Sequence, residues 1–146
     1  NAWVMLKSLE TMPLRFAAQC TSAMQIAKTL SRHPGVTSVR YPGLANHPQH
    51  ALACQQMSGF GSIVAFEVAG GATAAFTVLN QLNLIDISNN LGDSKSLACH
   101  PYTTTHSSLS DAELAELGLT PSHLRLSVGL EASEDLIIDL EQALAV

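Results

Sequence analysis

The sequence has 146 residues, 47% of them hydrophobic, and a formal net charge of −5, so it is long enough for one domain with a real core and too short for two of ordinary size. Its seven Lys and Arg residues are scattered, which argues against the basic surface that nucleic-acid backbones require. No apolar run approaches the roughly 20 residues that span a bilayer, so we expect no membrane contact.

The N-terminal 30 residues predict a long helix. Apolar residues recur at helical spacing up to Leu30, and Pro13 should bend or restart the helix. The sequence begins with neither an initiator Met nor a signal-peptide leader, so we expect it to come from the middle of a longer protein.

The rest of the chain alternates between strand and helix patterns. Strands are expected over 36–41, 62–68, 84–88 and 123–128, and helices over 48–57, 72–82 and 131–144. Phe76 and Leu79 should share the buried stripe of one helix, and Ser133 should cap the last. Ser110 and Glu113 match a capping box that opens a further short helix, ended by Gly118. This order favours a two-layer α/β (α+β) sandwich, in which helices cover a small, mostly antiparallel sheet.

One long polar run interrupts these elements. "SNNLGDSKSLACHPYTTTH", residues 88–106, follows a predicted strand and has no apolar period, as expected of a surface loop that carries function. Arg125 lies on the strand 123–128 and points away from Leu124 and Leu126. Its guanidinium should pair with a carboxylate, which is either a distant Asp or Glu of the chain or the carboxylate of a ligand.

Other candidate sites have simpler interpretations. Lys95 has polar neighbours, which do not provide the desolvated pocket that a Schiff-base lysine needs. His47 and His50 are two imidazoles without further ligands, so we expect surface histidines and no metal. The three cysteines are widely spaced and odd in number, which fits a reducing, cytoplasmic location and buried thiols. The glycine pairs match no phosphate-binding motif and should form turns.

A series of motifs resembles the C-terminal domain of the pyridoxal-phosphate enzymes of cysteine and methionine metabolism. They are, in order, "NAWVMLKSLETMPLR", "HPGVTSVRYPGL", "GFGSIVAFEV", "NNLGDSKSL", "HPYTTTHS", "LGLTPSHLRLSVGLE" and "EDLIIDLEQAL". The resemblance covers essentially residues 1–146, with 1–30 as the helix that joins two domains. It implies the small domain of a fold-type I enzyme. Within the family, "NNLGDSKSL" and "HPYTTTH" are more similar to the O-succinyl- and O-acetylhomoserine sulfhydrylases than to the lyases.

The resemblance also implies roles for four residues. Arg125 would bind the α-carboxylate of an amino-acid substrate, Asn90 and Leu91 would lie beside that substrate, and Thr105 would help to orient Arg125. The Schiff-base lysine and the cofactor ligands would belong to a preceding domain, so we expect no catalytic or cofactor-binding residue and no bound pyridoxal phosphate in this segment.

The function expected from these features is substrate binding within a sulfhydrylase that makes homocysteine for methionine biosynthesis. The segment would be inactive alone, and the full-length enzyme would be a cytoplasmic homotetramer. Two alternatives stay open. One is a cystathionine γ-synthase or a methionine or cystathionine γ-lyase, and the other is a stand-alone amino-acid-binding or interaction module.

Overall fold

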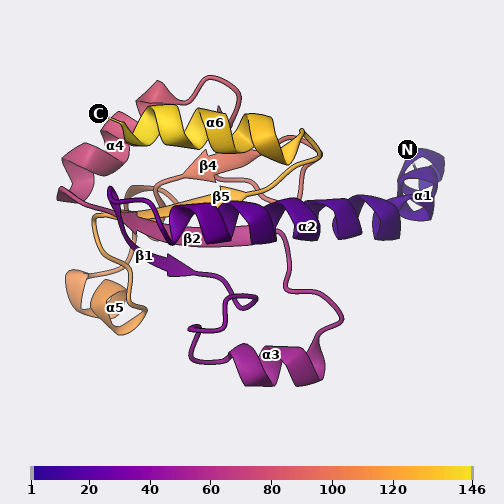
Figure 1. The fold of residues 1–146 in the computed structure, drawn as a ribbon, viewed down its shortest axis with the longest axis horizontal. Coiled ribbons are helices and arrows are strands. Elements are labelled where there is room, and N and C mark those ends of the chain that lie inside the picture. The colour runs from indigo at the N-terminus through magenta and orange to yellow at the C-terminus, as the bar shows by residue number, and fades with distance from the viewer. Residues whose placement is uncertain (1, 146) are drawn as a thin grey trace.

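The computed structural model describes residues 2–145, which form a five-stranded sheet with helices packed on it (Figure 1). The helices are α1 (Ala2–Glu10), α2 (Met12–Leu30), α3 (His50–Gln56), α4 (Gly71–Gln81), α5 (Asp111–Glu116) and α6 (Ser133–Leu144), with a short 3-10 helix at Pro101–Thr103. The strands are β1 (Val36–Arg40), β2 (Ile63–Val68), β3 (Asp86–Ile87), β4 (Leu97–Cys99) and β5 (His123–Ser127).

The last strand of the sequence lies in the middle of the sheet. The strand order is β1-β2-β5-β4-β3, and every neighbouring pair is antiparallel except the parallel pair β3–β4. The predicted mostly antiparallel sheet is therefore confirmed. The sequence pattern suggested that β5 is half-buried, whereas His123 and Ser127, which lie on the same face as Arg125, are also buried.

Three helices cover one face of the sheet. Helix α2 packs on β1 and β2, helix α4 packs on β2 and β5, and helix α6 packs on α2 and α4 (Figure 1). Side chains alternate between the two faces of each strand. The face toward the helices carries the buried side chains of Val64 and Phe66 from β2, which lie opposite Leu126 and Leu124 from β5. This arrangement confirms the expected two-layer sandwich and leaves Arg125 on the other face of the sheet.

The N-terminal helix is interrupted where Pro13 predicted. Thr11 separates α1 from α2, and Pro13 occupies the first turn of α2, where its missing amide costs nothing. Helix α1 buries none of its residues, and Trp3, Met5 and Leu6 are each more than half exposed. No described helix is both long and apolar enough to cross a membrane.

Several local expectations are wrong. Phe76 is 42% exposed and does not join the buried side of α4, which Ala75, Val78 and Leu79 form. Ser133 is already helical, so Ala132 takes the N-cap position and the Ser133 hydroxyl bonds to Glu134. Of the three cysteines, Cys99 is buried, Cys20 is half-buried and Cys54 is exposed.

The polar run 88–106 is also more ordered than expected. Strand β4 lies inside it, with Leu97, Ala98 and Cys99 all buried between β5 and β3. Three residues are too few to show a strand period, which is why the sequence pattern missed them. The run therefore divides into a loop over 88–96, a strand, and the turns that follow it.

Candidate carboxylate-binding site

Arg125 lies in the middle of the central strand, where β2 and β4 fix its backbone on both sides. It is opposite Ala65 on one neighbour and Cys99 on the other. Its Nη2 donates to the carbonyl oxygen of Asn89 at 2.8 Å and, at a longer 3.4 Å, to that of Asn90. Within residues 2–145 the ion pairs do not include Arg125, so its charge is not neutralised by a carboxylate of this chain.

The bonds that hold the guanidinium also bring the loop 88–96 to it. Asn90 and Leu91 are exposed on this loop, and the amide of Gly92 donates to Ser127 Oγ at 2.9 Å. Gly92 has a φ of 77°, a conformation that a glycine adopts without strain. Because Ser127 is two residues from Arg125 on β5, one strand anchors the loop at two points. The structure thus brings Asn90 to Arg125 and places Leu91 next to Asn90 on the same loop, whereas the substrate-binding roles of these residues are what the resemblance implies.

Thr105 does not make the contact expected of it. Its hydroxyl is paired with His106 Nδ1 at 2.8 Å, and in the described part of the chain it has no hydrogen bond to Arg125. The carbonyl groups of Asn89 and Asn90 orient the guanidinium instead. The assignment of Thr105 to the site rests on the resemblance alone.

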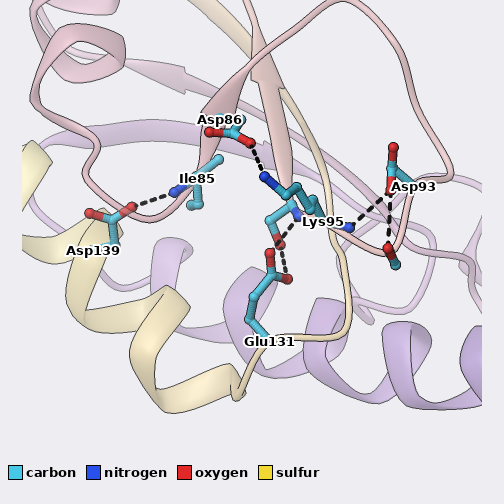
Figure 2. Close-up of polar contacts among 8 residues, drawn as sticks. Ile85, Asp86, Asp93, Lys95, Glu131 and Asp139 are labelled. Atoms are coloured by element: carbon cyan, nitrogen blue, oxygen red, sulfur yellow. Dashed lines mark hydrogen bonds and ion pairs between the residues drawn. The ribbon is translucent and has the colours of Figure 1, made fainter.

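Lysines of the described chain are unsuited to covalent cofactor attachment. Lys95 Nζ is paired with Asp86 at 3.1 Å (Figure 2). This hydrogen bond raises the pKa of Lys95. Lys7 is exposed and paired with Glu10, and Lys28 is exposed on α2. A lysine that attacks a carbonyl group must lose its proton near neutral pH, which requires desolvation or nearby positive charge. The lysines of residues 2–145 are therefore not suited to the covalent attachment of pyridoxal phosphate.

A buried clamp fixes the C-terminal end of the loop. Glu131, labelled in Figure 2, accepts from the amide and from the hydroxyl of Ser96, each at 2.8 Å. Ser96 Oγ also accepts from the amide of Gly129 at 2.8 Å. Ser96 is fully buried, so each of its polar groups needs a partner inside the protein. No local sequence pattern indicates this clamp, because Ser96 and Glu131 are 35 positions apart.

A second polar cluster lies on the same face of the sheet, and the sequence pattern missed it. Glu67 Oε1 is 3.9 Å from His123 Nδ1 and 3.7 Å from Arg40 Nη2. These atoms of Glu67 and His123 are buried without a hydrogen-bond partner among residues 2–145. Burial, followed by the positive charge of Arg40, lowers the pKa of His123. The imidazole is therefore held in its neutral form.

This cluster predicts a pH dependence of stability. The pKa of His123 is lowered in the folded protein, so below the ordinary value of about 6.5 the unfolded chain binds the proton more readily. The contribution of His123 to the stability of the fold is therefore fully present above pH 6.5, and it is lost as the pH falls from there toward the lowered pKa. Arg40, Glu67 and His100 are the charged or titratable groups that act on it.

Thermal unfolding between pH 7.5 and 5.5 measures this effect. We expect Tm to fall less steeply with decreasing pH in His123→Gln than in the unsubstituted protein. His47→Gln, in a turn near the surface, is the control and should keep the original slope. Equal slopes for all three proteins would contradict the assignment to His123.

Comparisons with known proteins identify the family of the chain. Residues 1–145 match the family model described as Cys/Met metabolism PLP-dependent enzyme. The chain is 50% identical to an O-succinylhomoserine sulfhydrylase of Mycobacterium tuberculosis over 99% of this chain and 37% of that protein. It is 43% identical to an L-methionine gamma-lyase of Pseudomonas putida over 99% of this chain and 36% of that protein.

A solved structure shows the same fold. It is described as an O-acetylhomoserine (thiol)-lyase of Campylobacter jejuni that carries N'-pyridoxyl-lysine-5'-monophosphate, and it superposes with a TM-score of 0.96 at 39% identity. The match covers 100% of this chain and 35% of that one. The chain thus spans little more than a third of the length of the relatives it matches.

Proposed function

The chain belongs to the Cys/Met-metabolism PLP-dependent enzymes, and on this basis we propose that it is the substrate-carboxylate-binding domain of a sulfhydrylase that makes homocysteine from an O-acylhomoserine. The sulfhydrylase of M. tuberculosis is more similar to the chain than the lyase of P. putida is, at 50% against 43% identity. This difference supports the sulfhydrylase over the lyase.

The observation that carries the proposal is the guanidinium of Arg125, whose charge has no carboxylate partner within the described chain. Two backbone carbonyl groups hold one of its nitrogens, and the structure gives its remaining N–H groups no acceptor among residues 2–145. A planar guanidinium binds a carboxylate through two parallel hydrogen bonds. Every amino-acid substrate presents such a carboxylate, so we assign this group to Arg125.

Asn90 and Leu91 complete the proposed site. The carbonyl group of Asn90 accepts a hydrogen bond from the guanidinium of Arg125, and the exposed Leu91 follows Asn90 on the same loop. The loop would cover one side of the bound substrate while the central strand holds the carboxylate. Orientation of this kind lowers the activation barrier because the reacting groups do not have to find one another in solution.

We also propose that the rest of the enzyme supplies the cofactor site. Pyridoxal phosphate acts as an electron sink in such enzymes, and no described lysine here suits its attachment. A preceding domain would hold it, and this chain alone would be inactive. The exposed apolar side chains of α1, which include Trp3, Met5 and Leu6, would then be covered by that domain or by another copy in a homo-oligomer.

Steady-state assays of the full-length protein that contains this chain test the proposed activity. Homocysteine should form from O-succinyl- or O-acetylhomoserine with sulfide. A synthase would instead prefer cysteine as the sulfur donor, and a lyase would release a volatile thiol from methionine without any donor. Either result would replace the sulfhydrylase with the corresponding family activity. Absence of all three reactions would favour a binding or interaction module.

Arg125→Lys tests the role of the guanidinium in the same protein. An ammonium group cannot form two parallel bonds with a carboxylate, so we expect KM for the O-acylhomoserine to rise about 10- to 100-fold while kcat changes less. Arg32→Lys, which changes an exposed arginine just after α2, is the matched control and should leave both constants unchanged. An unchanged KM in Arg125→Lys would remove this residue from the site.

A further inference from the structure

Gln19 is a buried polar residue on α2 whose side chain reaches the loop 88–96. Its side chain is enclosed, with only 6% of the residue exposed. Nε2 donates one hydrogen to the carbonyl oxygen of Asp93 at 2.8 Å and the other to that of Val128 at 2.9 Å. Both hydrogens of the amide are therefore used, and both acceptors are main-chain groups 74 and 109 positions away.

These two acceptors lie at the loop and at the end of the central strand. Asp93 follows Asn90 and Leu91 on the loop, and Val128 follows the strand that carries Arg125. Two further contacts of the loop come from that same strand, since Arg125 donates to Asn89 and Ser127 accepts from the amide of Gly92. Gln19 thus joins the loop to the end of the strand, and it does so from helix α2.

The space beside Gln19 shows why this contact matters. A cavity of about 680 Å³ lies between α2 and the loop, lined by Phe16 and Gln19 on one side and by residues 91–94 on the other. Side chains of residues 2–145 do not fill this space, so packing within this part of the chain does not set the distance between loop and helix. Of the hydrogen bonds in the described part of the chain, the one from Gln19 to Asp93 joins α2 to the loop, and the one from Gln19 to Val128 holds the same side chain against the strand end.

We propose that Gln19 is a positioning residue for substrate binding, which holds the loop of Asn90 and Leu91 at the distance from Arg125 that the substrate requires. This inference rests on the proposed function of Arg125. Loss of Gln19 leaves two carbonyl groups with no donor, and a buried unpaired polar group draws in water or moves away. The loop then shifts, and the affinity for the substrate falls although no group that touches the substrate has changed.

Gln19→Met in the full-length holoenzyme is the first test, because methionine has a similar shape and no donor. We expect KM for the O-acylhomoserine to rise about tenfold, with kcat within about twofold of the original. Gln25→Met, the same substitution at an exposed position of α2, should leave both constants unchanged. Equal kinetics for the two variants would overturn the inference.

Hydrogen exchange gives a readout that does not depend on the activity. The amides of residues 88–96 should exchange faster in Gln19→Met than in Gln25→Met, while those of β2 stay protected. If Arg125→Lys leaves KM unchanged, the proposed function fails. If Arg125→Lys raises KM and Gln19→Met alters neither KM nor loop exchange, only the role of Gln19 fails.

Gln19→Glu is the second variant, should the methionine protein not fold. A carboxylate facing two carbonyl oxygens is repelled, whereas a protonated carboxyl group still donates one hydrogen bond. We therefore expect the ratio of its KM to that of the original protein to fall as the pH decreases from 8.5 to 5.5. A constant ratio over this range would contradict the positioning role.

Discussion

Asp139→Asn is expected to lower the free energy of unfolding by about 3 kcal/mol or more. Asp139 is buried on α6 and accepts from three successive amides of the turn before β3, those of Asn83, Leu84 and Ile85, at 2.8 to 3.0 Å. Figure 2 shows the contact with Ile85. An asparagine keeps one acceptor oxygen and turns an NH2 group toward amides that are themselves donors, so at least one pair of donors is left face to face.

The same contacts set the pH range of this stabilisation. Burial acts to raise the pKa of Asp139, but the bonds from the three amides outweigh it and hold the pKa below its usual value of 3.8. A carboxyl group with a lowered pKa stabilises the fold above the pKa of the unfolded chain, and this contribution is lost as the pH falls through the folded pKa. The difference between Asp139→Asn and the original protein should therefore be constant at neutral pH and shrink below about pH 4.

Urea unfolding followed by circular dichroism at pH 7 measures the first effect. Asp135→Asn, one turn earlier on α6 and exposed, is the matched control and should cost no more than about 1 kcal/mol. The m-value should stay unchanged, so that the shift of the midpoint reports stability. Equal midpoints for the two variants would show that the three amides find water in place of Asp139.

Gly129→Ala should be at least as damaging. A Cβ at this position would lie 2.5 Å from the main-chain atoms Ser94 O and Lys95 C and would contact Glu131 Oε2 even more closely. Main-chain atoms cannot rotate away, so the loop and the strand end must separate. This would break the bonds of Ser96 to Gly129 and Glu131. We expect a loss of about 3 kcal/mol or more, since overpacking is here combined with the loss of a buried polar network.

The control for this substitution is another glycine without a positive φ. A Cβ at Gly59 would meet only Cys20 Sγ, at 3.8 Å, which is an ordinary contact distance. The free energy of unfolding of Gly59→Ala should therefore lie within about 0.5 kcal/mol of that of the original protein. Soluble, cooperative unfolding of Gly129→Ala at the same midpoint as Gly59→Ala would show that the loop tolerates displacement.

Much of the fold could be predicted from the sequence because it depends on local patterns. The alternation of Leu124, Arg125 and Leu126 was enough to separate the covered face of the sheet from the face that carries the guanidinium. The capping box of Ser110 and Glu113 is present in the structure with both of its hydrogen bonds. Such signals lie within a few residues of one another, so one sequence shows them.

Contacts between distant residues could not be predicted in this way. The bonds of Asp139 span 54 to 56 positions, and Gln19 looked like any polar residue on a helix. The pair of Glu67 and His123 depends on the register between two strands, which no local period specifies. The role of Thr105 was carried over by resemblance, and its hydroxyl bonds to its own neighbour His106 in the structure.

The position of β5 has a consequence for synthesis of the protein on the ribosome. Strand β2 pairs with β1 early, but its other edge has no partner until residues 123–127 are made, some 55 residues later. During that interval the apolar face of an incomplete sheet and a free strand edge are exposed, which is the condition under which nascent chains aggregate or need a chaperone. The same strand delivers Arg125. A chain that stops short of it therefore lacks both a closed sheet and the charge that we propose to bind a carboxylate.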